Sequence, residues 1–484
     1  MSGGTHLFVL VLFSMAWFFA LGGLIVNFLS WRAALKAKDG ERVPSGFPFI
    51  PGILGSVCVF LTLPLIGKAQ GAEVPWPWAW ILLPFFLDMY GPGGFVMALL
   101  GFVRETPLVE PEAAPLPPDL AAEIERSQRL LEQRRAAATG CLLGTAVGDA
   151  LGLPCEGLPR ARQLRLFPRL EHYRFLLGKG MCSDDTDHAC MVAQSLAVAG
   201  NNARRFASSL AWRLRFWLLG LPAGIGMATL RAILKLWMFF PPQFSGVRSA
   251  GNGPAMRIAL LGVCFADNDA ALILHTAAAT GITHRDPKAE CGALAVALAA
   301  RSSMRTEDSE AYVAHLRRFL APFGEAGTEL LSLIERAQAS VARGEATADF
   351  ADSIGCARGV SGYMYHSVPA ALQAWFSHPR DFAAAVTAVI RCGGDTDTTA
   401  AIAGAIVGAG VGKSGIPERW LSDLWDWPRG VPWLEAVAER AVRSTLGDCR
   451  EQALYISPLR LFARNLAFLI LVLAHGFRRL APPY

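Results

Sequence analysis

Four glycines spaced four residues apart, Gly140, Gly144, Gly148 and Gly152, constrain the fold of this chain more than any other feature. Residues four apart lie on one face of an α-helix, so these glycines predict a strip without side chains. Such a strip lets the backbone of another helix approach closely, and taken alone it indicates packing more than catalysis. From about residue 136 to 450 the pattern continues as helix after helix, rich in Ala and Leu. Runs of helical length and composition include 190–199, 270–279, 289–300 and 382–390. The predicted fold class is all-α.

The first 104 residues are different, because they contain three apolar stretches. Residues 6–30 have no Asp, Glu, Lys or Arg and exceed the ~20 residues that a helix needs to span a bilayer. Residues 48–67 are also uncharged, and residues 76–103 open with three tryptophans, a composition typical of a membrane interface. A secretory signal is disfavoured, since no basic residue precedes the first run and more apolar segments follow. We expect a transmembrane region at 1–104 with about three spans.

The loops between these stretches predict the orientation. Residues 31–42 carry four basic side chains, whereas residues 68–75 carry only Lys68. The positive-inside rule then places residues 31–47 in the cytoplasm, and three spans return the chain there at Arg104. The ten cysteines include no CxxC pair, which fits reduced thiols in the cytosol. A multi-pass membrane protein with its larger domain facing the cytoplasm is therefore expected.

The rest of the chain divides into three parts. Residues 105–135 are predicted to be a Pro-rich linker and a charged connecting helix, followed by the all-α domain at 136–450. The tail, 451–484, contains a short apolar segment at 465–477, flanked by arginines. A membrane-surface or re-entrant helix is the preferred interpretation, and packing on the N-terminal spans is the alternative. The net charge of +5 and the lack of a basic run give no sign of nucleic-acid binding.

Two acidic clusters carry the strongest chemical signal. Asp395 and Asp397 alternate with threonines, including Thr398, after two glycines and before a run of small apolar residues. Clusters that offer only oxygen suit hard cations such as Mg²⁺, Mn²⁺ or Ca²⁺, and not zinc or copper. The apolar run indicates that these carboxylates lie where a loop enters a buried helix. The sequence therefore predicts a metal site.

The second cluster is Ser183-Asp184-Asp185. Adjacent carboxylates repel each other in a partly buried site unless a cation holds them. A helix N-cap at Ser183 or Asp184 is the simpler explanation, and it is compatible with metal binding. Asp187 and His188, which follow, are expected on the helix surface.

Three further places are weaker candidates. Glu156 stands just past a Gly/Pro break at the end of the glycine helix, where it can point into a cleft. Gly251-Asn252-Gly253 could present backbone N–H groups to a phosphate, although this tripeptide is most often only a tight turn. His284 is a lone loop histidine, which is more often structural than functional.

Together these motifs resemble the ADP-ribosylglycohydrolases, the family of dinitrogenase reductase-activating glycohydrolase. The resemblance covers roughly residues 136–425, extends to the final helices up to 450, and leaves the N-terminal spans and the tail outside. It rests on an ordered set: GxxxGxxxGDALGxPxE at 140–156, SDDT at 183–186, GNGxAMR at 251–257, TH at 283–284, GYxxxS at 362–367, GGDTDTxAA at 393–401 and IPxxW at 416–420.

The resemblance implies two Mg²⁺ or Mn²⁺ ions in a central cleft. The implied metal ligands are Ser183, Asp184, Asp185, Asp395, Asp397 and Thr398, with Asp397 or Asp185 bridging both ions. The implied catalytic residues are Glu156, Asp184 and Asp185. The implied substrate-binding residues are Phe244, Ser249, Gly251, Asn252, Gly253 and His284. Family members usually have threonine where this chain has Ser183, and serine keeps the oxygen.

The implied activity is hydrolysis of the glycosidic bond between ADP-ribose and an acceptor, here by a membrane-anchored enzyme. The expected partners are an ADP-ribosylated protein or small molecule and the membrane. A membrane-tethered ADP-ribose sensor without turnover is the alternative. A prenyl-type synthase is disfavoured because the first cluster has DDTD and not DDxxD, and a transporter because the charged motifs lie outside the spans.

Overall fold

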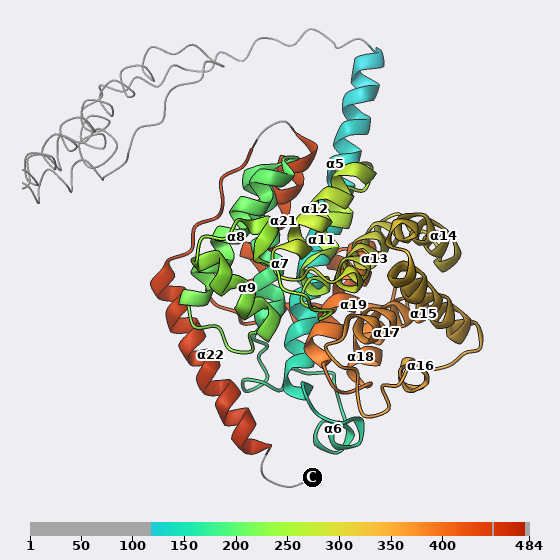
Figure 1. Ribbon diagram of the computed structural model, residues 1–484, viewed down its shortest axis with the longest axis vertical. Helices are drawn as coiled ribbons and strands as arrows, with labels where there is room; N and C mark the ends of the chain where they lie inside the picture. The colour runs from blue at the N-terminus through green and yellow to red at the C-terminus, as the bar shows by residue number, and fades with distance from the viewer. Residues whose placement is uncertain (1–117, 448–449, 480–484) are drawn as a thin grey trace, which may run out of the picture. The chain divides into compact units, whose positions relative to one another are not determined.

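The glycine strip lies on the helix around which the domain is built. The computed structural model describes residues 118–447 and 450–479, with side chains from residue 123, all within one structural unit, Pro117–Tyr484. The three predicted spans lie outside the described residues. The described residues form helices and only isolated β-bridges, so the all-α prediction is confirmed (Figure 1).

The helices follow one another through short loops. They are α5 Pro118–Gly152, α6 Arg160–Leu166, α7 Asp184–Ala199, α8 Ala203–Leu219, α9 Met227–Trp237, α10 Pro242–Ser245, α11 Ala259–Cys264, α12 Asp269–Gly281, α13 Pro287–Met304, α14 Ser309–Leu320, α15 Glu325–Ala342, α16 Thr347–Ser353, α17 Met364–Ser377, α18 Phe382–Ile390, α19 Thr396–Val411, α20 Glu418–Ser422, α21 Val431–Leu446 and α22 Pro458–Arg478. Short 3₁₀ turns include η1, Leu153–Cys155, directly after α5, and η2, Ala255–Arg257.

Helices α5 and α19 pack backbone against backbone in antiparallel register. A methyl group added to Gly140 would lie 2.1 Å from the carbonyl oxygen of Gly408, and one added to Gly144 would lie 2.1 Å from that of Gly404. Gly148 meets Ala400 in the same way, and Gly152 meets Thr396. Real Cβ atoms do not tolerate such distances, so the whole strip requires glycine. The close packing of helices predicted from glycines spaced four residues apart is confirmed.

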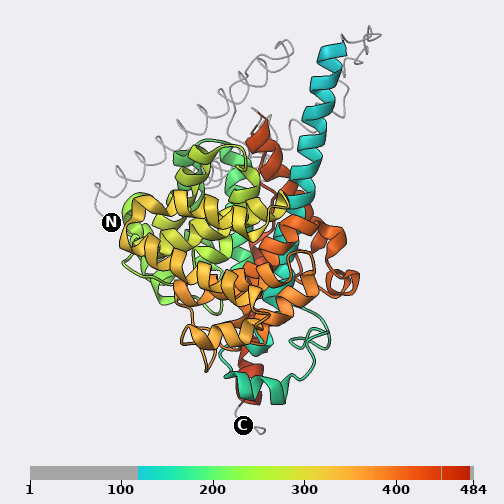
Figure 2. The ribbon, with the colours of Figure 1, turned by 90° about the vertical axis from the view of Figure 1, so that its right-hand side faces the viewer.

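The other helices surround this pair in layers. Helices α7, α11 and α21 pack directly on α5, while α13, α17 and α18 pack on α19. Helices α14, α15 and α16 lie outside α13 and α17, and α8 and α9 lie outside α7 (Figures 1 and 2). One continuous hydrophobic cluster fills the spaces between them. The layers bring the C-terminal end of α5 and the N-terminal ends of α7 and α19 together.

Several details differ from the sequence-based expectations. Helix α5 runs without a break across the boundary expected at residue 135, so the charged connecting helix and the glycine helix are one element. The tail helix α22 has 21 residues, which is longer than the expected apolar segment, and it packs on this domain. The described cysteines are all free and buried, in agreement with reduced thiols.

Among the described residues, two helices are long and apolar enough to cross a membrane. The first covers Glu123–Cys155, and because most of it is buried inside the domain it is a core helix. The second is α22, most of which is not buried.

Candidate metal centre

The first acidic cluster begins α7. Ser183 is the N-cap of this helix, and its Oγ accepts a hydrogen bond from the backbone N–H of Asp185, at 3.3 Å. The same hydroxyl donates to Oδ2 of Asp185 at 3.0 Å. The capping role considered from the sequence is therefore present. With Ser183 as the N-cap, Asp184 and Asp185 lie in the first turn of α7, where the helix dipole favours negative charge.

The second cluster begins α19 in the same way. Asp395 is its N-cap residue, and Asp397 and Thr398 lie in its first turn. The hydroxyl of Thr398 donates to Oδ2 of Asp185 at 3.3 Å, which joins the two clusters directly. Thr396 donates to the carbonyl of Gly152 at 2.8 Å, and so ties the start of α19 to the end of α5. Residues 213 positions apart in the chain are thus hydrogen-bonded neighbours.

Asp149 belongs to the site but is absent from the sequence-based set. Its carboxylate accepts the backbone N–H of Ser183 at 2.9 Å, the N–H of Thr186 at 3.2 Å and the hydroxyl of Thr186 at 2.5 Å. Oxygens of Asp149, Asp185 and Asp397 lie within 4.8 Å of one another. Because the oxygens of Asp149 already accept these bonds, its main role is to hold the start of α7. A charged residue inside an otherwise apolar Gly/Ala/Leu helix was the available sequence signal.

Glu156 stands at the C-terminal end of η1, directly beyond α5, as its position after the Gly/Pro break predicted. Its backbone is held on two sides: its N–H donates to Leu153, and its carbonyl accepts from Arg479 at 2.7 Å. Glu156 is exposed, yet the surrounding protein partly desolvates its carboxyl group and raises its pKa, and the nearby Asp395 raises this pKa further. A carboxyl group with a raised pKa can carry a proton near neutral pH, as a general acid or base must.

The site concentrates negative charge in a buried place. Burial raises the pKa values of Asp184, Asp185 and Asp397 well above their usual range, and neighbouring carboxylates add to this. Burial likewise raises the pKa of Asp149 to about 7, although four hydrogen bonds oppose the shift. Several carboxylates that cannot all ionise together need either protons or cations.

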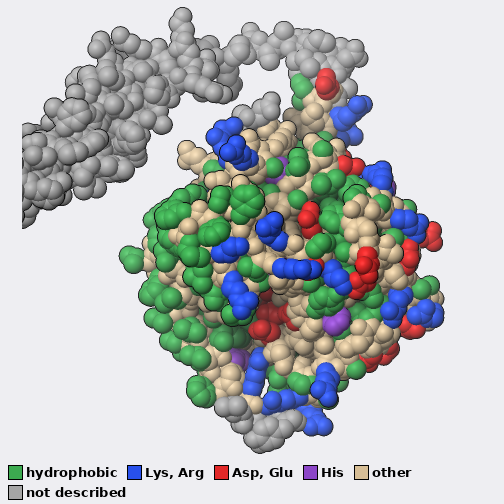
Figure 3. All heavy atoms as spheres, viewed as in Figure 1, with side chains coloured by type: hydrophobic (Ala, Val, Ile, Leu, Met, Phe, Trp, Pro, Cys, Tyr) green, Lys and Arg blue, Asp and Glu red, His purple; other side chains and the backbone are tan. Residues whose placement is uncertain are grey.

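The donor set fits a hard cation. Oδ1 of Asp185 and Oδ1 of Asp397 are buried and have no hydrogen-bond partner among the described residues. Buried carboxylate oxygens without a partner are costly, and a bound cation would remove that cost. All the side chains that converge here offer oxygen, which suits Mg²⁺ or Mn²⁺. In the space-filling view, acidic side chains gather at a hollow near the centre of the face, with Lys and Arg side chains around it (Figure 3).

A chain of buried charges supports the site from behind. Arg429 pairs with Asp187 and with Asp426, and Arg464 of α22 also pairs with Asp426. Burial would raise the pKa of Asp426, but the two arginines outweigh it and hold this pKa below its usual value. Arg464 also donates to the carbonyl of Cys182, the residue before the N-cap Ser183. The tail helix is thus hydrogen-bonded to the segment that leads into Ser183 and α7.

Asp187 and His188 are not on the helix surface, so that expectation is wrong. Both side chains are buried, because α8 and the residues around Arg429 cover this side of α7. Asp187 accepts a hydrogen bond from Trp217 at 2.7 Å, and Nδ1 of His188 lies 2.9 Å from Arg257. Composition alone did not reveal these partners, because they come from distant parts of the chain.

The Gly-Asn-Gly turn lies beside both Asp395, the N-cap residue of α19, and His284. Asn252 donates through Nδ2 to Oδ2 of Asp395 at 2.7 Å and to Ser367 at 2.9 Å, so it orients a predicted metal ligand. A methyl group added to Gly251 would lie 3.2 Å from the ring of His284, and one added to Gly253 would lie 3.1 Å from it. Burial lowers the pKa of His284 to about 3, and Arg257 contributes, so this ring is neutral.

Two features of the turn differ from a free phosphate cradle. The backbone N–H of Asn252 already donates to Gly362 at 2.9 Å, and that of Gly251 donates to Ser249 at 3.3 Å. The element that follows, η2, has three residues and is not an α-helix. Phe244 lies nearby on α10 with its side chain half exposed, where a ligand could contact it.

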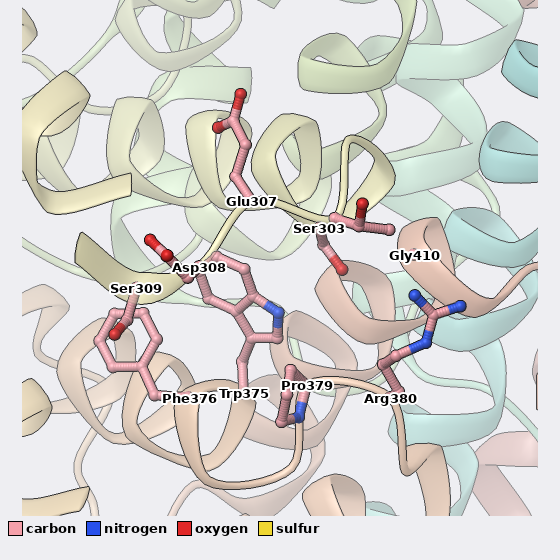
Figure 4. Close-up of a pocket in the computed structure, with 10 residues that line it drawn as sticks. Ser303, Glu307, Asp308, Ser309, Trp375, Phe376, Pro379, Arg380 and Gly410 are labelled. Carbon is pink, nitrogen blue, oxygen red and sulfur yellow. The ribbon is translucent and has the colours of Figure 1, made fainter. Parts of the chain in front are cut away.

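A separate hollow of about 340 Å³ is lined by Trp375, Phe376, Arg380 and Gly410, among others (Figure 4). Gly410 is near the C-terminal end of α19, whereas Asp397 is at its start. At 1.5 Å per residue these positions are about 20 Å apart. This hollow is therefore distinct from the acidic site.

Comparisons with known proteins point to one family. The family model of the ADP-ribosylglycohydrolases matches residues 130–451. An uncharacterized protein of Archaeoglobus fulgidus is 31% identical over 59% of this chain and 90% of its own length. The ADP-ribosyl-[dinitrogen reductase] glycohydrolase of Rhodospirillum rubrum is 26% identical over 59% of this chain and 90% of its own. The ADP-ribosylarginine hydrolase Tri1 of Pseudomonas putida is 29% identical over 60% and 75%.

The chain is also similar to a solved structure, described as an ADP-ribosylglycohydrolase-related protein complex. It has a TM-score of 0.50 and 29% identity, and the match covers 65% of this chain and 99% of that one. The family match takes in the glycine helix and both acidic clusters, but it ends before α22. The chain belongs to the ADP-ribosylglycohydrolase family.

Proposed function

We propose that this protein is a membrane-anchored hydrolase that depends on two Mg²⁺ or Mn²⁺ ions and releases ADP-ribose from an acceptor. One observation carries the proposal: the helices α7 and α19 begin at the same place and bring two buried, unpartnered carboxylate oxygens together there. Family membership supplies the reaction class. The membrane anchor rests on the sequence of residues 1–104.

In this proposal Ser183, Asp184 and Asp185 hold cations from α7, and Asp395, Asp397 and Thr398 hold them from α19. Bound cations would fix ribose hydroxyls and lower the pKa of a coordinated water. Asp397 and Asp185 would each offer a cation one oxygen that has no protein partner. Asn252 and Ser183 hold Asp395 and Asp185 in place through hydrogen bonds.

Glu156, with its raised pKa, is the proposed proton carrier, assisted by Asp184 or Asp185. Cleavage at the anomeric carbon of ribose passes through a positively charged, oxocarbenium-like state. In this role Glu156 takes a proton from the attacking water and gives a proton to the leaving group, which completes the hydrolysis.

The proposed ADP-ribose pocket consists of Phe244, Ser249, Gly251, Asn252, Gly253 and His284. Glycine at 251 and 253 lets the turn pack against His284, because an added methyl would lie 3.2 Å and 3.1 Å from its ring, and this neutral ring can donate or accept one hydrogen bond there. Phe244 offers an exposed aromatic surface for stacking. The substrate is an ADP-ribosylated protein or small molecule.

The test is release of free ADP-ribose by the purified full-length protein in Mg²⁺, from substrates with arginine and serine linkages. The Asp184→Ala/Asp397→Ala double variant should lose at least about 100-fold in rate, since metal ligands are removed. Glu335→Gln, a surface change on α15, is the matched control and should keep full activity. Binding of ADP-ribose by the unaltered protein without any turnover would instead favour a sensor.

A further inference from the structure

Helix α22 turns its apolar side outward. Its exposed stripe repeats every three or four residues and consists of Leu459, Phe462, Leu466, Ile470, Leu473 and Phe477. A surface helix of a globular protein normally turns such a stripe to the core and its polar side to water. Here the side facing the domain instead carries buried Arg464 and Asn465, with Phe468. The apolar stripe has no partner among the residues that the structure describes.

Helices α8 and α9 extend this surface. Their outward side chains, and those of the loops that follow them, include Phe216, Leu219, Leu221, Met227, Met238 and Phe239, all exposed. Asn465 of α22 donates to the carbonyl of Gly220, at the end of α8, so the two parts are neighbours. Hydrophobic side chains gather over α8, α9 and α22 along the left side of Figure 3. We call this surface the apolar face.

The segments that form the apolar face contain no acidic residue. From His188 to Ala266 the sequence has eight Lys and Arg and no Asp or Glu, and from residue 452 to 484 it has four Arg and again no acid. The whole chain has 40 acidic residues, so their absence from both segments is a specific feature. Arg204, Arg205, Arg231, Arg460 and Arg478 are exposed at or near this surface.

The combination of apolar and basic side chains favours a membrane over a second copy of the chain as the partner. Two copies of the chain joined by a twofold axis would bring the same basic surface against itself, and like charges oppose such a contact. Exposed aromatic and aliphatic side chains with a basic fringe are instead the composition of helices that lie in a membrane interface. The phosphates of anionic lipids complement the basic side chains.

We propose that α8, α9 and α22 form a docking face for an anionic phospholipid bilayer. The apolar side chains enter the boundary between headgroups and acyl chains, and the arginines contact lipid phosphates. At 1.5 Å per residue, the 21 residues of α22 extend about 30 Å along the membrane plane. This inference does not depend on the proposed activity.

The docking face is joined to the metal centre through short contacts. A methyl group on Gly224, in the loop between α8 and α9, would lie 3.4 Å from Oδ1 of Asp184. Arg464 of α22 donates to the carbonyl of Cys182, and Arg479, directly after α22, donates to the carbonyl of Glu156. A domain docked on this face therefore holds its acidic site close to the lipid surface.

The test uses the full-length protein in lipid nanodiscs, with the photo-crosslinker benzoyl-phenylalanine placed at one position at a time. Phe239, 83% exposed, and Leu473, 53% exposed, report on the face. Ser332, exposed on α15 on the opposite side of the domain, is the matched control (Figure 1). After irradiation, mass spectrometry should show phospholipid adducts at Phe239 and Leu473 and none at Ser332. Phosphatidylglycerol discs should give at least about threefold more adduct than phosphatidylcholine discs, because anionic headgroups attract the basic side chains.

Three results would overturn the proposal: adducts with residues 1–104 of the same chain, adducts with a second copy, or equal lipid labelling at Ser332. A charge variant gives an independent check. Phe216→Asp with Phe239→Asp should lower lipid labelling at Leu473 at least about fivefold, because charges at the interface resist burial. Ser332→Asp adds a charge on the far side and should change nothing. Thermal melting with Mg²⁺ verifies that each variant is folded, and unchanged labelling in a folded double variant would contradict the docking face.

Discussion

Asp397 shows how a single residue can oppose stability for the sake of a bound ion. Its carboxylate is buried at the start of α19, keeps one oxygen without a hydrogen-bond partner, and lies close to Asp185 and Asp149. Its pKa is raised first by burial and then by these neighbours and Glu156. In the absence of a cation, such a group costs the folded state free energy.

The first prediction follows from this cost. Asp397→Asn should raise the free energy of unfolding in EDTA, by about 1–3 kcal/mol, because the amide removes charge repulsion without changing the side-chain volume. The same variant should lose most of the stabilisation that Mg²⁺ gives to the unaltered protein. Thermal melting with EDTA and with Mg²⁺ measures both effects. Lower stability in EDTA would show that Asp397 is a structural residue.

The pH dependence of stability without metal gives the second prediction. The folded-state pKa of Asp149 is raised to about 7 from the ordinary 3.8, chiefly by burial. A raised carboxyl pKa contributes stability at low pH, and that contribution is lost as pH rises through the folded value. In EDTA the melting temperature should therefore fall between pH 5.5 and pH 8. With saturating Mg²⁺ the fall should shrink or reverse, since metal binding requires ionised carboxylates. A melting temperature that rises with pH in EDTA would contradict the assignment.

At the scale of elements, the contact between α5 and α19 sets the relative position of Asp149, Asp397 and Glu156. It is made by main-chain atoms, since the glycines of both helices pack on carbonyl groups. Oxygens of residues from α5, α7 and α19 meet within 4.8 Å only because these helix ends converge. The metal site is therefore a property of the packing between helices as much as of the two acidic motifs.

The third prediction tests this contact. Gly144→Val should lower the free energy of unfolding by more than about 3 kcal/mol, because its first carbon alone would lie 2.1 Å from the carbonyl of Gly404. Cation affinity should fall as well, since α19 must move. Gly476→Ala in α22, where an added methyl meets nothing within 4 Å, is the control and should be neutral or stabilising by up to about 1 kcal/mol. Chemical denaturation and calorimetric titration with Mn²⁺ measure the two quantities. Tolerance of valine at residue 144 would refute a main-chain contact.

The sequence revealed those parts of the site whose residues are neighbours in the chain. The all-α fold, the glycine strip and both acidic clusters were visible because each depends on neighbours or on helical spacing. Asp149 was missed because its partner, Ser183, is 34 positions away. Arg464 was missed for the same reason, being 282 positions from Cys182. A charge inside an apolar helix is visible in the sequence, but its partner at such a distance is not, so the contacts that support the loop could come only from the structure.

At the scale of the molecule, this chain is a family domain with added parts. The match ends at residue 451, yet α22 lies beyond it and is bonded to the loops that carry Ser183 and Glu156. The tail was expected to be a separate membrane-associated segment. In the structure one side of α22 is instead part of the domain, and only the other side is left for a membrane.

The fourth prediction concerns this added helix. Arg464→Met should weaken Mn²⁺ affinity at least about tenfold and lower stability by roughly 3 kcal/mol, because Asp426 loses one of two buried partners and the Cys182 carbonyl loses its donor. Arg460→Met, on the exposed side of the same helix, is the matched control and should change neither quantity. Calorimetric titration and chemical denaturation provide the measurements. Unchanged affinity in Arg464→Met would mean that α22 only covers the domain.

The glycine strip also has an evolutionary consequence. The separation between α5 and α19 is determined by main-chain atoms, which every residue type shares, and not by the size of interlocking side chains. Substitutions on the remaining faces of these helices can then accumulate without altering the distance between Asp149 on α5 and Asp397 on α19. The relatives that match this chain at 26–31% identity show how much of the sequence differs within the same family. We expect such divergence to be tolerated at the outer faces of both helices and excluded from the four glycines.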